Sequence, residues 1–156
     1  MNDTTAAHKA LWGPVVLLGR ILFSIVFLYY CVANLDGQNL AYAAAAHVPA
    51  AKLLVPLSGV LILIGGLSVL LGYKARLGAW LIVLFLVPVT PMMHNFWAVK
   101  DPMMHALQMG NFYRNLSMLG GAFLITQFGA GPWSLDALAA SNRSASAPAP
   151  PAAAAR

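Results

Sequence analysis

The sequence predicts an all-α integral membrane protein, a four-helix transmembrane bundle, and two observations carry that prediction. Of the 156 residues, 60% are hydrophobic and only 8% are charged, which is more apolar surface than a soluble domain of this size buries. The apolar residues gather in four stretches of about 17–22 residues, a length at which a helix crosses a bilayer. These stretches lie at residues 11–32, 53–71, 77–93 and 112–128. We expect a short cytoplasmic N-terminus over residues 1–10 and one membrane domain over residues 11–136.

The first span begins close to Pro14, which suits the first turn of a helix because its missing N–H would be unpaired there. Polar residues and a glycine, Asn34 to Gly37, end this span. The span is too long for the apolar core of a cleaved signal peptide, so we expect it to remain as an anchor. The alanine-rich residues 40–47 predict a short helix at the membrane interface.

The second span holds Pro56 in its first turn and ends in a tight basic turn at residues 72–76. The third span meets Pro88 and Pro91 near its far end, and each removes a backbone hydrogen bond, so we expect a kink or unwinding there. The fourth span begins at Phe112. After it, residues 137–156 consist mainly of alanine, serine and proline, a composition that predicts a disordered tail.

Charge and cysteine content narrow the function classes. The positive residues are scattered, with no basic run, so we expect no nucleic-acid partner. Their modest bias between loops predicts a multi-pass protein with both termini cytoplasmic. Cys31 is the single cysteine, which excludes an internal disulfide or a CxxC pair. His94 and His105 lack metal-ligand spacing, so we expect no metal site.

Arg20 is the costliest residue of the first span, because a charge inside a membrane segment is unfavourable. Three interpretations stay open for it. Its side chain snorkels to the lipid headgroups, or it pairs internally with Ser68 or Gln127, or it binds an anion or another ligand.

The densest polar set lies around the end of the third span and the start of the fourth. Its candidate ligand-binding residues are His94, Asn95, Trp97, Arg114 and Asn115. An imidazole that titrates near neutral pH and a guanidinium suit a quinone carbonyl or a small anion, with an aromatic wall beside them. The alternative is ordinary polarity at a membrane interface.

Several short motifs, in order, resemble the DoxX family of small four-span bacterial membrane proteins. The motifs are Gly19-Arg20, Gly59 through Gly66, Leu71-Gly72-Tyr73, His94-Asn95-Phe96-Trp97, and Arg114-Asn115-Leu116 with Gly120-Gly121. The resemblance covers about residues 15 to 136. It departs where many members carry Lys, Glu and Asp and this chain has Asn34, Ile62 and Asn95.

The resemblance implies a small subunit of a quinone-linked redox or stress-response system in the bacterial inner membrane. The alternative function is a non-enzymatic scaffold or a module that binds or transports a small molecule. Whether the chain is an enzyme stays open, and quinone is the one cofactor suggested. The expected partners are the lipid bilayer, a soluble or membrane redox protein, and a second copy of the chain.

Overall fold

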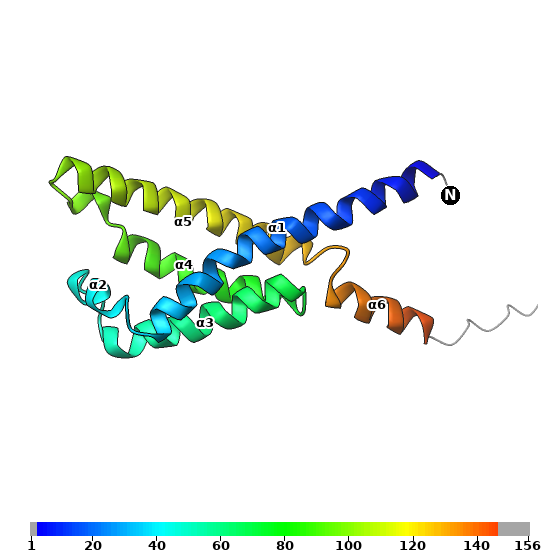
Figure 1. Cartoon of the computed structure of the whole chain (residues 1–156), viewed down its shortest axis with the longest axis horizontal. Helices are drawn as coiled ribbons and strands as arrows, with labels where there is room; N and C mark the ends of the chain where they lie inside the picture. Colours follow the sequence, from blue (N-terminus) through cyan, green and yellow to red (C-terminus); the bar gives the residue numbers. More distant parts are fainter. Residues whose placement is uncertain (1–2, 147–156) are drawn as a thin grey trace, which may run out of the picture.

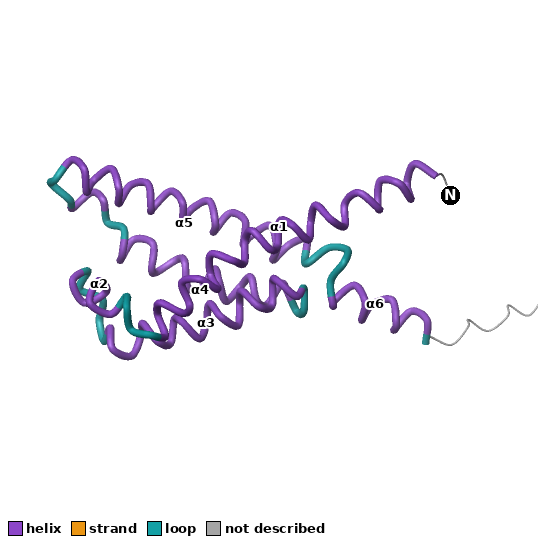
Figure 2. The backbone as a smooth tube through the Cα atoms, in the orientation of Figure 1, coloured by secondary structure: helices purple, strands orange, loops and turns teal. Residues whose placement is uncertain are grey.

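The computed structural model describes residues 3–146, and this part of the chain is helical without any strand (Figure 1, Figure 2). In order, the elements are α1 (Asp3–Leu35), α2 (Leu40–Ala45), α3 (Ala51–Leu71), α4 (Ala75–Met93), the 3₁₀ helix η1 (Phe96–Ala98), α5 (Pro102–Phe128) and α6 (Leu135–Ala145). The predicted all-helical fold is confirmed for the described residues.

Three helical segments in the described part are long and apolar enough to cross a membrane. They are Trp12–Leu35, Ala51–Leu71 and Ala75–Ala98. The fourth predicted span lies within α5, whose first half carries several polar residues, Gln108, Asn111, Arg114 and Asn115 among them. Because these residues dilute the apolar character of α5, the membrane character is confirmed for three segments and the count of four is not.

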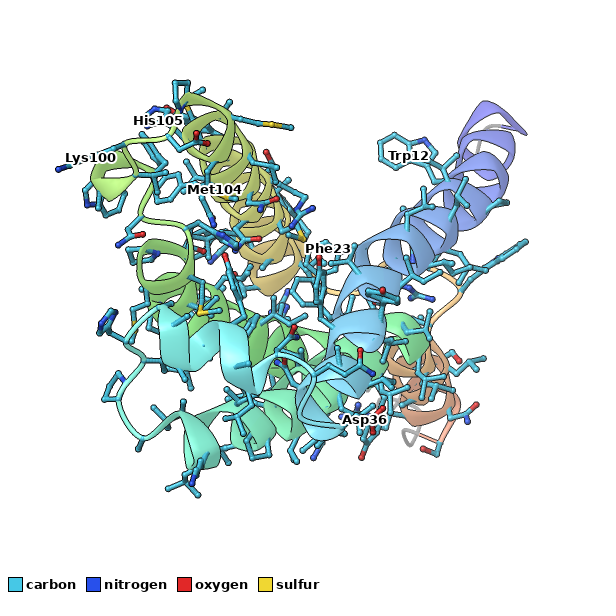
Figure 3. The ribbon with its side chains drawn as sticks, turned by 60° about the vertical axis from the view of Figure 1, so that its left-hand side comes forward. Trp12, Phe23, Asp36, Lys100, Met104 and His105 are labelled. Carbon is cyan, nitrogen blue, oxygen red and sulfur yellow. The ribbon has the colours of Figure 1, made fainter. Side chains whose placement is uncertain are left out.

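The long helices pack in chain order. α1 lies against α3, α3 against α4, and α4 against α5, while the short α2 covers part of α3. α1 and α5 approach each other near Phe23, whose ring would lie 3.1 Å from a Cβ added to Gly121 (Figure 3). From there they diverge, so that the start of α5 and the end of α1 lie on opposite sides of α4 (Figure 1). We call the end formed by residues 36–50 and 94–101 the loop end, and the opposite end, with residues 72–74 and 129–134, the terminal end.

A small apolar core holds the helices together, and its fully buried members include Ile62, Ile82 and Leu86. Glycine lets α3 and α4 approach closely at their crossing. A Cβ on Gly65 would lie 2.9 Å from the carbonyl oxygen of Gly78. In lipid there is no hydrophobic driving force between helices. Small residues at a crossing therefore stabilise it by letting the two backbones approach closely and make more van der Waals contacts.

The structure differs from the expected disordered tail over residues 137–145, which belong to α6, while residues 147–156 lie outside the described residues. Local capping explains this helix. The Ser134 hydroxyl accepts a hydrogen bond from the Ala137 N–H at 3.1 Å. The Asp136 carboxylate accepts from the N–H groups of Lys74 (2.8 Å) and Ala75 (3.1 Å), which ties α6 to the start of α4.

Pro88 and Pro91 both lie inside α4, which stays helical to Met93. The expected unwinding ahead of His94 is therefore wrong. The helix ends only at His94, where the backbone turns into η1.

Candidate functional site

A cavity of about 440 Å³ opens at the loop end, within the roughly 300–1,000 Å³ typical of ligand pockets. Side chains from all of α1 to α5 line it, and most of them are apolar. We call it the loop-end cleft. The residues that matter below are Phe27, Asn34, Tyr42, Leu61, His94, Arg114, Asn115 and Met118.

Asn115 is the most informative residue of the cleft. Its side chain is 7% exposed and lines the cavity, yet it makes no hydrogen bond to another residue of the described part. The amide atoms are not fully enclosed, so they face the cavity and are open to a ligand. A hydrogen bond to a ligand carbonyl or N–H there would contribute about 0.5–1.5 kcal/mol.

Arg114 precedes Asn115 on α5 and also lines the cleft. Its side chain is exposed, and within residues 3–146 it forms no ion pair or hydrogen bond. No Asp side chain lines the cleft, and the chain has no Glu. Positive charge is therefore unbalanced at this site, which favours a ligand with an anionic group.

A hydrogen-bonded chain closes the loop end of the cleft. His94 Nδ1 lies 2.8 Å from Gln108 Oε1, Gln108 Nε2 donates to the Tyr42 hydroxyl at 2.8 Å, and that hydroxyl donates to the Met93 carbonyl at 3.2 Å. Because Gln108 Oε1 can only accept, His94 Nδ1 carries the proton. The chain joins α2, the end of α4 and α5.

Asn34 supplies a second polar group on the α1 side of the cleft. Its Nδ2 donates to Ser58 Oγ at 3.0 Å, and its Oδ1 accepts from Asn39 Nδ2 at 2.6 Å. Unlike Asn115, this amide therefore has partners on both of its atoms, and it joins α1 to α3.

Of the six residues that the sequence suggested as ligand-binding, the structure brings His94, Arg114 and Asn115 together in the cleft. Asn95 and Trp97 do not line it. Trp97 is 60% exposed and packs on Phe96, with 5.2 Å between ring centroids.

The sixth residue, Arg20, lies at the terminal end. Its side chain is 4% exposed, with Nη1 donating to the Ala130 carbonyl (3.0 Å) and Nη2 to the Trp133 carbonyl (2.8 Å). The side chain therefore does not snorkel but pairs internally with backbone carbonyls, and the expected partners, Ser68 and Gln127, are wrong. Ser68, one expected partner, instead donates to the Tyr73 carbonyl at 2.6 Å.

Sequence reasoning missed Tyr42, which lines the cleft, and Gln108, which hydrogen-bonds to Tyr42 and His94 beside it. A signal for Gln108 existed, because it lies three residues before Asn111 and six before Arg114, on one side of a helix. Among the described residues no group of three or more His, Cys, Asp or Glu is placed to hold a metal ion.

Comparison with known proteins gives a family and one curated relative. The family model that matches is described as the SURF4 family and covers residues 15–140. The ER-derived vesicles protein ERV29 of Saccharomyces cerevisiae is 34% identical over 66 residues, which are 42% of this chain and 21% of the yeast protein. The chain thus spans about a fifth of the length of that relative. No solved structure shows significant similarity to the chain.

These findings correct three expectations. The resemblance to the DoxX family is wrong, because the model of a different family covers the same part of the chain. The quinone-linked redox subunit is wrong with it, since that function rested on the resemblance. The bacterial inner membrane is also wrong as a location, because the matching family is SURF4 and the yeast relative is named as a protein of ER-derived vesicles. The side on which the termini lie stays a prediction.

Proposed function

This chain belongs to the SURF4 family, and from that membership we propose that it is a receptor-like protein of an ER-derived vesicle membrane. In this role it binds a segment of a client protein and does not change that protein chemically. The name of the yeast relative, an ER-derived vesicles protein, supports the compartment.

The loop-end cleft supports the binding role, and Asn115 is the observation that carries it. Asn115 is a buried residue whose amide faces the cavity without a partner in the described part, so a ligand carbonyl or N–H can hydrogen-bond to it. The apolar walls of the cleft suit a segment with apolar side chains, while Arg114 gives the site a preference for nearby negative charge.

We also propose that α5 is the fourth membrane span. With 27 residues it is about 40 Å long, more than the hydrocarbon core needs, so its polar first turns can extend beyond the core. Four spans put both termini on one side of the membrane, and three put them on opposite sides. In a background that carries Cys31→Ala, Lys9→Cys and Ser141→Cys should both react, or both stay unlabelled, when an impermeant reagent is added from one side. Labelling of only one of them would exclude the fourth span.

The receptor role is tested with ER membranes that bud vesicles in vitro. A tagged chain should be enriched in the budded vesicles over the donor membranes. A photoreactive residue at Met118, inside the cleft, should crosslink to a soluble secretory protein, and Asn115→Leu should reduce that product. The same photoreactive residue at Phe123, outside the cleft, is the matched control. Retention of the chain in the donor membranes, or equal crosslinking at both positions, would contradict the proposal.

A further inference from the structure

The loop-end cleft has lining residues on both α1 and α5. These helices are not among the closely packed pairs, and they separate from Phe23 toward the loop end (Figure 3). One lining residue of each helix is exposed, Tyr30 on α1 (37%) and Arg114 on α5. Because α1 is a candidate span and α5 is proposed above as another, we infer that acyl chains of the bilayer reach the apolar walls between them.

Two polar groups stand beside this apolar space in an order that matches a phospholipid. Asn115 lies deeper along α5 than Gln108 by seven residues, or about 10 Å of helix, and its amide lacks a partner in the described part. Arg114 precedes it, and its long side chain can reach back toward the loop end. In a phospholipid, the ester carbonyls lie deeper in the membrane than the phosphate. In the same way, the Asn115 amide lies deeper along α5 than the position that the Arg114 guanidinium can reach.

We propose that a phospholipid with a net negative charge, drawn from the surrounding leaflet, occupies the loop-end cleft. Its acyl chain packs along Phe27, Leu61 and Met118. The Asn115 amide donates to an ester carbonyl, and the Arg114 guanidinium holds the phosphate. This is the cleft of the proposed function, so a client segment would have to displace the lipid.

The charge of the lining selects among lipids. No described Asp lines the cleft, so the ammonium group of a zwitterionic headgroup finds no counter-charge there. A headgroup with net negative charge keeps the attraction of its phosphate to Arg114 without placing a second cation beside it. The same chemistry would hold free phosphate, but only a lipid fills the apolar part of the cleft.

Purified full-length chain in nanodiscs of equal parts phosphatidylcholine and phosphatidylglycerol provides the test. After transfer to detergent, native mass spectrometry counts the lipids that remain on the chain. We expect retained phosphatidylglycerol to exceed phosphatidylcholine several-fold, because the choline group would place a second cation beside Arg114. Arg114→Gln should abolish this preference, and Asn115→Leu should lower retention of both lipids.

Lys100→Gln is the matched control, because Lys100 is also an exposed cation of the loop end but does not line the cleft. It should retain lipid as the parent does. Millimolar inorganic phosphate should not displace the lipid; displacement would mean a site for a free anion. Equal retention of both lipids by the parent, or equal effects of Arg114→Gln and Lys100→Gln, would overturn the proposal. Because Arg114 is exposed, we expect Arg114→Gln to leave the fold intact, so a change in lipid retention would report on the site itself. The experiment contains no client protein, so a negative result would overturn the lipid site and would not bear on the proposed client binding.

Discussion

Replacing Arg20 with leucine should release the segment that follows α5 from the rest of the terminal end. In the parent, the two Nη groups hold the carbonyls of Ala130 and Trp133, more than 100 residues away in the chain. The approach is tight, since a Cβ on Gly72 would lie 2.6 Å from Arg20 Nη1. Leucine fits a membrane helix well, yet it leaves both carbonyls without their partner.

The magnitude follows from these contacts. A hydrogen bond with a charged donor contributes about 1.5–3 kcal/mol, so the pair contributes at most about 3–6 kcal/mol. Leucine recovers part of this, because the buried guanidinium carries a desolvation cost and its Nε has no partner. We expect Arg20→Leu to lower the free energy of unfolding by about 2–4 kcal/mol.

Unfolding in mixed micelles with increasing dodecyl sulfate, followed by far-ultraviolet circular dichroism, measures this change. Arg76→Leu is the control, since Arg76 is an exposed arginine of the same end without a hydrogen bond in the described part. In a background that carries Cys31→Ala, a cysteine at Ser134, now 4% exposed, should react faster with a thiol reagent when Arg20 is leucine. Unchanged or raised stability together with an unchanged labelling rate would refute the role given to Arg20.

Three further changes test the packing by the same unfolding assay. Asp136→Ala removes the carboxylate that caps the start of α4 and should cost about 0.5–2 kcal/mol, the usual range for a lost cap; an unchanged midpoint would show that the cap is not stabilising. Ser24→Ala removes a fully buried hydroxyl without a partner and should be neutral or stabilising by up to about 1 kcal/mol, so a clear loss of stability would reveal a missed hydrogen bond. Gly78→Ala places a Cβ against the side chain of Ser68 and should cost about 1–3 kcal/mol, whereas Gly110→Ala, with nothing within 4 Å, should not; equal effects would contradict the close α3–α4 crossing.

The family assignment shows what short sequence motifs can identify in a small membrane protein and what they cannot. Paired glycines, aromatic residues and a basic turn recur in small membrane helices because the same packing problem recurs, with small residues at crossings and aromatic residues at interfaces. Such motifs therefore predicted the helical membrane fold and misassigned the family. The match over residues 15–140 depends on the whole segment and corrected it.

The sequence by itself determined the helices and their membrane character, because length, apolar content and the cost of an unpaired backbone in lipid depend only on local composition. It also singled out Arg20, Arg114 and Asn115 as polar residues at positions where polarity is expensive. Only the tertiary structure decided what each of them does. Both Nη groups of Arg20 find partners because the chain returns with the carbonyls of residues 130 and 133, while Asn115 faces the cleft without a partner in the described part. Hydrogen-bond partners more than 100 residues apart and the angle between two helices are properties of packing, and no local pattern encodes them.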